Sequence, residues 1–270
     1  MTGPAVTFDD IIAGLDRVGA RNRRFIVHAS LSSFGRVVGG ADTVVDAVTQ
    51  VGQAVLAATF TFCPAAVAPP DDRPKRNGAD YDRDRLGDED PTPFTPDLPA
   101  ARPMGIVAET LRRRPEAVRS RHPLSSFAAI GRDADRYVAA HDWNAPMQPL
   151  QRLYDDGGYV LMLGTLLTSC TTIHLGEQHA GRCPFIRWAK VADGGIHRVR
   201  VGGCSDGFER LAPWIEGTAQ THVGRARVRM FSMAAAVEAT VRRLAEDRHA
   251  LVCPRRCRRC MDAADGGPQE

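Results

Sequence analysis

Apolar positions in the first quarter of the chain change their spacing from one segment to the next. Residues 24–29 and 55–61 are short apolar, partly β-branched runs, which is typical of buried strands. Between them lie a loop rich in small residues, 30–40, and a segment with apolar residues on one helical side, 41–51. Strand, loop, helix and strand in this order predict a βαβ unit. The expected fold is therefore α/β, with a parallel sheet covered by helices.

The same two spacings continue through the rest of the chain. Helical spacing occurs at 8–18, where Thr7 is placed to cap the helix, and at 104–114, 134–141, 172–181 and 232–248. Strand-like runs occur at 125–131, 159–163, 185–190 and 197–201. The last two flank Asp193-Gly194-Gly195, and this arrangement predicts a hairpin. We expect the hairpin and the helices after it to form a small C-terminal subdomain.

Residues 64–103 interrupt the pattern with nine prolines and almost no periodicity, which predicts a long irregular excursion. Within it, residues 71–90 hold eight acids and five bases, a net charge of −3 in a chain of net charge +3. One interpretation is a solvated surface loop. The other is an acidic wall that attracts a polycation, with Asp71, Asp72 and Asp80 among its carboxylates.

Composition excludes several classes of protein. Of 270 residues, 43% are hydrophobic and 25% charged, which provides for a full core and argues against disorder. The arginines are scattered, so we expect no nucleic-acid partner. The start of the sequence lacks a basic and apolar leader, and no apolar run is long enough to span a membrane. We therefore expect a cytoplasmic location and no membrane partner.

Candidate chemistry is sparse when each residue is considered alone. His28 ends one predicted strand and His174 follows another, so both lie where open α/β sheets bind ligands. Position alone favours a structural role for such histidines. Glu109 and Glu177 fall on predicted helices, where carboxylates are usually solvated. The 30–40 loop can present free backbone N–H groups to phosphates, although a tight strand-to-helix turn is the more common explanation of such a loop.

Five blocks of sequence are recognisable together: VHASLSSFGRVVGGADTVVDAV (27–48), ATFTF (58–62), MGIVAETLRRRPEAVRSRHPLSSFAAIG (104–131), PLQRLYDDGGYVLMLG (149–164) and TTIHLGE (171–177). The RSxHPxxSFAA and TTxHLxE patterns are specific in combination. On these residues the chain resembles the aminoglycoside 3-N-acetyltransferase family, which differs in fold from the histone-acetylating superfamily.

This resemblance implies an α/β/α sandwich that binds acetyl-coenzyme A. It implies one antibiotic N-acetyltransferase domain over residues 1–270, with 64–103 as an acidic insertion and 249–270 as a cysteine-rich tail. The donor is expected to lie across the 30–37 loop and the 119–126 segment. The candidate contacts there are Ser30, Ser32, Ser33, Phe34, Gly35, Val37, Arg119, Ser120, His122 and Ser126.

The resemblance also assigns roles in catalysis. His174 is the expected general base that deprotonates an amine, the 3-amino group of an aminoglycoside, with His28 and Glu109 in support. Transfer is expected to be direct, because an amine held beside a thioester needs no acyl-enzyme. Expected contacts to the cationic substrate are Thr61, Asp71, Asp72, Asp80 and Glu177. Such an activity is associated with antibiotic resistance, and a monomer or homodimer is expected.

The chain departs from the family at three places, one of which is AATFT (57–61) in place of the usual MPTFT. Family members often carry DSNTTLH where this chain has TSCTTIH, so Thr168 and Cys170 replace an Asp and an Asn. Glu109 is then the best candidate to orient the imidazole of His174. AP-M-QPL (145–150) replaces the common GE-x-SPL. These changes leave two alternatives open: acylation of another amine in secondary metabolism, and a non-catalytic protein that binds aminoglycoside or coenzyme A.

Seven cysteines, an odd number in a chain expected in the cytoplasm, favour thiols or a metal site over disulfides. Cys257 and Cys260 have the CxxC spacing of a zinc knuckle. Cys183 and Cys204 flank the predicted hairpin and complete a hypothetical structural zinc site of four thiolates. The alternative is a set of unrelated free thiols.

Overall fold

Three buried parallel strands form the centre of the computed structural model, which describes residues 5–269. β1 (Arg24–Ala29) pairs in parallel with β2 (Ala54–Ala58) on one side and with β6 (Tyr159–Leu163) on the other. Every residue of β2 is buried. Near-continuous apolar strands of this kind are expected where both faces of a sheet are covered. The predicted parallel βαβ unit is therefore confirmed at the centre of the sheet.

Antiparallel strands extend the sheet on both sides. β5 (Phe127–Gly131) pairs with β2 and carries β4 (Val118–Arg119) at the edge, and β10 (Ala226–Ser232) pairs with β6 and carries β9 (Ala219–Val223). The order is β4-β5-β2-β1-β6-β10-β9. β4–β5 and β9–β10 are consecutive in the chain, and strands joined by such short connections pair antiparallel. β4, β9 and β10 were not among the strands predicted from the sequence.

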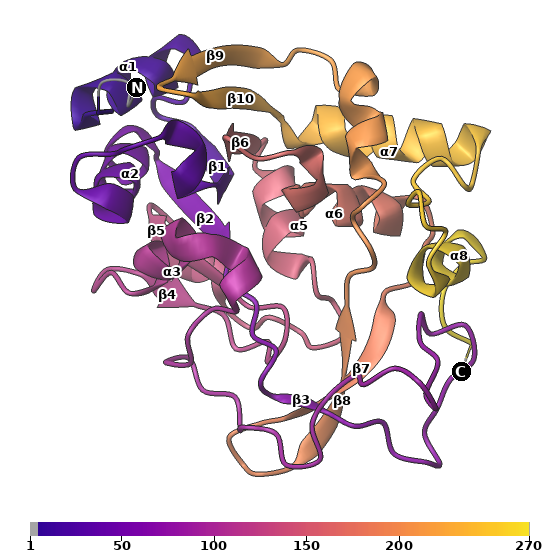
Figure 1. Ribbon diagram of the computed structural model, residues 1–270. Coiled ribbons are helices and arrows are strands. Elements are labelled where there is room, and N and C mark those ends of the chain that lie inside the picture. Colours follow the sequence, from indigo (N-terminus) through magenta and orange to yellow (C-terminus); the bar gives the residue numbers. More distant parts are fainter. Residues whose placement is uncertain (1–4, 270) are drawn as a thin grey trace.

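Helices cover both faces of this sheet, as Figure 1 shows. The core on one face contains residues of α1 (Phe8–Arg17), α2 (Gly40–Val51) and α3 (Gly105–Arg112). The core on the other face contains residues of α4 (Ala134–Val138), α5 (Gln148–Asp155), α6 (Thr172–His179) and α7 (Met233–Glu246). Side chains alternate between the two cores: Phe25 and Val27 enter the first, Ile26 the second. The α/β/α sandwich is confirmed.

A smaller sheet lies beyond the carboxyl ends of the parallel strands. Its order is β3 (Ala65–Ala66), β7 (Phe185–Lys190), β8 (Ile196–Val201), and all its pairs are antiparallel. β7 and β8 are the hairpin that the Asp193-Gly194-Gly195 turn predicted. α8 (Arg258–Ala264) lies near this sheet (Figure 1).

The 64–103 excursion is irregular, as predicted, but it packs closely on the smaller sheet. Asn77 is 1% exposed, and its side chain accepts from Ile186 N at 2.7 Å and donates to Ile186 O at 3.0 Å. Trp188 Nε1 donates to Asp72 at 2.8 Å. These contacts hold the excursion over β7.

Short 3₁₀ turns complete the connections: η1 (Leu31–Phe34), η2 (Arg102–Met104), η3 (Leu167–Ser169) and η4 (Phe208–Trp214). Among the described residues, no helix combines the length and the apolar character that crossing a bilayer requires.

Candidate functional site

His174 lies on α6, the helix that follows the central strand β6 at its carboxyl end. The residue is only 9% exposed, and its ring meets Phe208 edge to face at a centroid distance of 4.8 Å. On another side the imidazole is closed in by backbone. A Cβ added to Gly202 would lie 3.1 Å from His174 Cδ2 and 3.3 Å from Nε2. The ring is thus held in one orientation by close packing.

A carboxylate three residues further along α6 fixes the imidazole. His174 Nδ1 lies 2.7 Å from Glu177 Oε2, and the two residues share one face of the helix. Glu177 is itself held by Arg182, whose Nη1 donates to Oε1 at 2.5 Å. Because a carboxylate oxygen accepts, this contact favours the imidazole tautomer with its proton on Nδ1 and its lone pair on Nε2. This is the tautomer that a general base requires.

His174 borders a cleft of about 490 Å³. Its walls come from segments that are far apart in sequence: the chain after β2, the excursion, β7, the end of β8, and α8. The side chains and backbone that line it include Phe60, Phe62, Leu86, Asp88, Ser125, Arg187, Gly202, Gly203 and Arg259. A volume of this size is typical of small-molecule sites.

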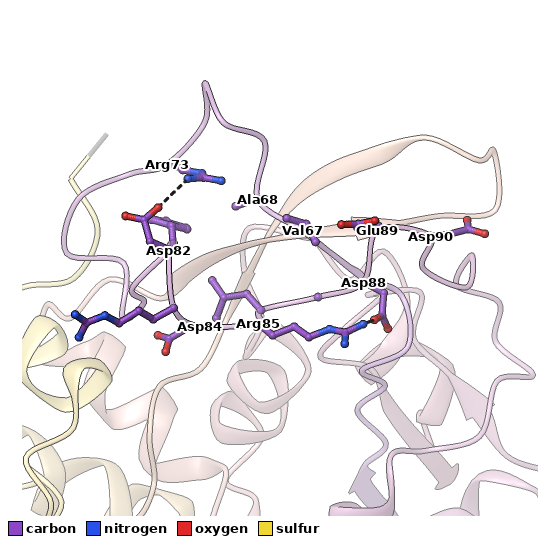
Figure 2. A pocket seen from close by; sticks show the side chains of 13 residues that line it. Val67, Ala68, Arg73, Asp82, Asp84, Arg85, Asp88, Glu89 and Asp90 are labelled. Atoms are coloured by element: carbon purple, nitrogen blue, oxygen red, sulfur yellow. Dashed lines mark hydrogen bonds and ion pairs between the residues drawn. The ribbon is translucent and has the colours of Figure 1, made fainter.

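Residues 85–88 of the excursion separate this cleft from a second cavity of about 700 Å³, drawn in Figure 2. Five acids line the second cavity: Asp82, Asp84, Asp88, Glu89 and Asp90. Three of them are partly neutralised. Arg73 lies 3.5 Å from Asp82 and Arg85 pairs with Asp88 (Figure 2), and Lys190 Nζ lies 3.0 Å from Asp90 Oδ1. The excess of carboxylates makes this cavity attractive to a cation.

The three acids chosen from the sequence lie elsewhere. Asp72 accepts from Trp188 and is 3.3 Å from Arg198, and Asp80 pairs with Arg258 at 3.0 Å. Neither Asp71, Asp72 nor Asp80 lines the cleft at His174 or the cavity in Figure 2. The acidic character of the excursion was predicted correctly, but the sequence offered no signal for which acids face a cavity.

Glu109 has partners other than His174. Its carboxylate accepts from Arg112 at 2.7 and 2.8 Å and from Ala100 N at 2.9 Å. Burial opposes ionisation, but the hydrogen bonds from Arg112 and Ala100 outweigh it and lower the pKa of Glu109. Its helix, α3, covers the opposite face of the sheet from α6. The expectation that Glu109 orients His174 is corrected: Glu177 does so, at a spacing visible in TTIHLGE.

His28 is buried at the end of β1, and its Nε2 has no hydrogen-bond partner. Burial lowers the pKa of His28 to about 4, so the ring is neutral at neutral pH. Nε2 therefore lacks the partner that buried polar groups usually have.

The 30–37 loop follows β1 at the same edge. Its first part is the 3₁₀ turn η1, closed by Ser33 Oγ donating to Ser30 O at 2.6 Å. Ser30 and Ser32 hydroxyls lie 3.3 Å apart, while Phe34 is buried as the anchor. Gly35 has φ +89°, and a Cβ there would meet Arg225 Nε at 3.3 Å. Hydroxyls, a cation and a close backbone suit an anionic, phosphate-bearing ligand.

In the 119–126 segment, the second one expected to bind the acetyl donor, the side chains make hydrogen bonds within the protein. Arg119 donates to Thr59 O at 2.6 Å, Pro96 O at 2.8 Å and Ser126 Oγ at 3.2 Å. Burial lowers the pKa of Arg119 to about 10. Ser126 Oγ also donates to Thr59 O, and Ser120 Oγ accepts from Phe127 N. These side chains fasten the excursion and β4 to the sheet.

Two further expected contacts are also internal. His122 Nδ1 accepts from Leu124 N and Ser125 N at 3.2 and 3.0 Å, and Nε2 is 3.0 Å from Arg200 O. Burial lowers the pKa of His122 to about 4. Thr61 is fully buried and donates to Pro123 O at 2.5 Å. The RSxHPxxSFAA segment around His122 therefore forms the turn that places Ser125 at the cleft.

The cysteine prediction requires a correction. The structure brings Cys204, Cys257 and Cys260 together, but the fourth thiol is Cys253, not Cys183. Cys183 is exposed before β7, where its backbone N–H donates to Gly266 O. Cys170, in the segment before His174, is buried, and burial raises its pKa to about 12, so it stays a neutral thiol.

Both a family model and a curated relative match this chain, and both are named for aminoglycoside 3-N-acetyltransferases. The family model described as Aminoglycoside 3-N-acetyltransferase matches residues 26–245. Aminoglycoside N(3)-acetyltransferase VIII of Streptomyces fradiae is 37% identical over 183 residues, 66% of this chain and 63% of the relative. The match thus spans less than two thirds of the relative's length.

Solved structures agree over most of the chain. AAC-IIIb in a binary complex with CoASH superposes with a TM-score of 0.74 at 25% identity, over 90% of this chain and 97% of the other. AAC-VIa bound to sisomicin gives 0.71 at 25% identity, over 90% and 98%.

Proposed function

The chain belongs to the aminoglycoside 3-N-acetyltransferase family, and on that premise we propose that it transfers the acetyl group of acetyl-coenzyme A to the 3-amino group of an aminoglycoside. The observation that carries the proposal is the hydrogen-bonded pair of His174 and Glu177 at the wall of a cleft. A relative of similar fold binds CoASH and another binds sisomicin, an aminoglycoside.

In the proposed reaction, Nε2 of His174 takes a proton from the substrate ammonium. The amine nitrogen then attacks the thioester carbon, and the tetrahedral intermediate expels the coenzyme A thiolate. The thiolate takes the second proton of the attacking nitrogen, so the products are the amide, the coenzyme A thiol and the proton held by His174. Glu177 stabilises the imidazolium that forms in between, because its carboxylate lies 2.7 Å from Nδ1. A general base of this kind contributes about 10²–10⁴ in rate. No covalent enzyme intermediate is required if both substrates are held together.

The donor side is proposed to be the 30–37 loop. Ser30 N donates to Leu163 O at 2.9 Å, so the loop is joined to the end of β6, the strand that leads towards α6. Arg225 beside Gly35 supplies a positive charge for a phosphate. His28, buried nearby on β1 with a free Nε2, is proposed to contact the donor or the intermediate as a neutral group.

One observation favours a different acceptor. The cleft beside His174 is lined by Arg85, Arg187 and Arg259, with Asp88 as the acid among its lining residues. A polycation is repelled by such a wall unless it is bound mainly by the acidic cavity beyond residues 85–88. The second candidate function is acetylation of an amine whose molecule also carries a negative group.

The test is release of coenzyme A thiol from acetyl-coenzyme A with a panel of aminoglycosides and of anionic amines. We expect release with an aminoglycoside, and a loss of about 10²–10⁴ in kcat for His174→Ala. Glu177→Gln should reduce kcat in the same direction, because the imidazolium loses its counter-charge. His179→Ala is the matched control, since His179 is exposed on the same helix and bonds Gln151.

Turnover by His174→Ala at the wild-type rate would exclude His174 as the base. Release with anionic amines alone would replace the first candidate with the second. Binding of coenzyme A and an aminoglycoside in a calorimeter without any release would show a non-catalytic binding protein.

A further inference from the structure

Four cysteines that the proposed reaction does not use converge from two parts of the chain. Cys204 lies in the loop after β8, Cys253 lies after α7, and Cys257 and Cys260 are the N-cap and an early residue of α8. Their four Sγ atoms all lie within 4.8 Å of one another. In a tetrahedral zinc site with Zn–S bonds of about 2.3 Å, neighbouring sulfurs are roughly 3.8 Å apart. No pair of these sulfurs therefore exceeds that spacing by more than about 1 Å.

The surrounding backbone already donates to two of the sulfurs. Cys253 N donates to Cys260 Sγ at 3.3 Å, and Cys257 N donates to Cys253 Sγ at 3.4 Å. Amide hydrogen bonds of this kind stabilise thiolates and orient them as ligands. Four thiolates and one divalent ion carry a net charge of −2. The arginines of the CPRRCRRC segment, Arg255, Arg256, Arg258 and Arg259, offset that charge along the chain.

Packing alone offers little to hold this part of the molecule in place. α8 has seven residues, and an isolated helix of this length is not stable in water. The apolar cluster around it has Val252, Cys253, Cys260 and Ala264 as its buried members. Small units with so little apolar contact are usually stabilised by a disulfide or a metal. All seven cysteines of the chain are free of disulfides.

We propose that Cys204, Cys253, Cys257 and Cys260 bind one structural zinc ion. With four protein ligands the site is closed, so the ion takes no part in the reaction. The proposal stands on the geometry of the thiols and is independent of the proposed function.

The site would fasten two walls of the cleft to each other. Cys204 is two residues after Gly202, whose backbone borders the His174 ring. From α8, Asp262 accepts from Gly78 N at 2.8 Å and Arg258 pairs with Asp80 at 3.0 Å, so α8 also anchors the excursion. An ion between Cys204 and α8 would therefore fix the position of the loop beside His174 relative to the excursion.

The test is the metal content of the reduced, full-length chain by elemental mass spectrometry. We expect one zinc per chain, and loss of that zinc in Cys253→Ser and in Cys260→Ser. Cys183→Ser and Cys63→Ser are matched controls, because both cysteines are exposed and lie outside the cluster. Co²⁺ added to the metal-free chain should give the absorption spectrum of a tetrahedral cobalt thiolate.

A second measurement covers variants that fail to fold. Chelation of zinc from the wild-type chain should lower Tm and speed proteolysis within residues 64–103, and added zinc should reverse both effects. Zinc loss in Cys183→Ser but not in Cys253→Ser would overturn the ligand set. Absence of stoichiometric zinc together with no cobalt spectrum, or two disulfides among these four cysteines in the chain as purified, would overturn the site.

Discussion

At the scale of single residues, hydrogen bonding distinguishes structural histidines from the candidate catalytic one. His122 uses both ring nitrogens on backbone groups, and His141 bonds Ser120 Oγ and Ala145 O. These two are structural. His174 differs, because Glu177 occupies Nδ1 while Nε2 keeps its lone pair at a cleft. The assignment of a chemical role to His174 therefore depends on an unused nitrogen, not on burial.

The contact between Gly202 and His174 provides a sharp test at this scale. Gly202→Ala places a methyl group about 3.1 Å from the imidazole, so the ring must move by a few tenths of an ångström. We expect kcat to fall about tenfold or more, because proton transfer depends on alignment, while affinity for coenzyme A is unchanged. Steady-state kinetics with calorimetry of coenzyme A would measure both.

Gly203→Ala is the neighbouring control. Its added methyl group meets Phe185 at an ordinary 3.4 Å and does not press on His174, so kcat should fall less than in Gly202→Ala although Gly203 also lines the cleft. Equal kcat for the two variants would show that the position of the His174 ring is not limiting.

At the scale of elements, the site arises from two adjacent parallel strands. β1 leads into η1 and β6 leads through η3 into α6, so one sheet edge presents both the serine-rich turn and the helix of His174. Ligands bind at this edge in open α/β sheets. The two connections touch: a Cβ on Gly164, just after β6, would lie 1.6 Å from Ser33 Oγ. The shape of the serine turn therefore depends on glycine at the end of the neighbouring strand.

Substitution of that glycine tests the donor site. Gly164→Ala should displace η1 and raise KM for acetyl-coenzyme A several-fold, with a smaller effect on KM for the acceptor. Gly157→Ala is a matched control, because both glycines have φ 69° and a Cβ on Gly157 meets nothing within 4 Å. Both variants bear a backbone strain of about 1 kcal/mol, so only the displacement of η1 separates them. An unchanged KM in Gly164→Ala would remove the 30–37 loop from the donor site.

At the scale of the whole molecule, stability is linked to acid through buried neutral histidines. Burial lowers the pKa of His28 and His122 to about 4 and that of His141 to about 3, from an ordinary 6.5. Below pH 6.5 these three histidines bind protons in the unfolded chain but stay neutral in the folded chain. The free energy of unfolding therefore falls as the pH is lowered from 6.5 to about 4, and it is insensitive to these groups above 7.

Each such histidine contributes a slope of about 1.4 kcal/mol per pH unit inside this window. Urea unfolding at pH 7, 6 and 5 measures the slope. His141→Gln should reduce it by the share of one histidine, whereas His222→Gln should leave it unchanged because His222 is exposed. A free energy of unfolding that is constant from pH 7 to 5 would contradict the burial of neutral imidazoles.

The sequence predicted those helices and strands in which the spacing of apolar residues follows the spacing of the buried positions. The central strands are almost entirely apolar, and the β7–β8 turn is rich in glycine, so both could be predicted. β10 was missed because Arg227 and Arg229 alternate with its apolar residues, and Arg229 is only 4% exposed. α5 was missed because it is polar overall and has only eight residues.

In the site, local chemistry was predictable and long-range contact was not. His174 was predicted from the TTIHLGE block (171–177), and Glu177 is the last residue of the same block. Cys253 could not be preferred over Cys183, because that choice depends on how the chain after α7 returns to β8. Likewise, nothing in the sequence separates acids that face a cavity from acids that hold Trp188 or Arg258.

The hydrogen bond from Gly78 to Asp262 joins residues that are 184 positions apart. During translation at about 5–20 residues per second, roughly 10–40 s elapse between the emergence of the two partners. The sandwich strands that precede α8 can pair in that interval, but the excursion has yet to receive its anchor. A nascent chain should therefore pass through a stage with a formed sheet and an unfinished cleft, open to ribosome-associated chaperones and proteases.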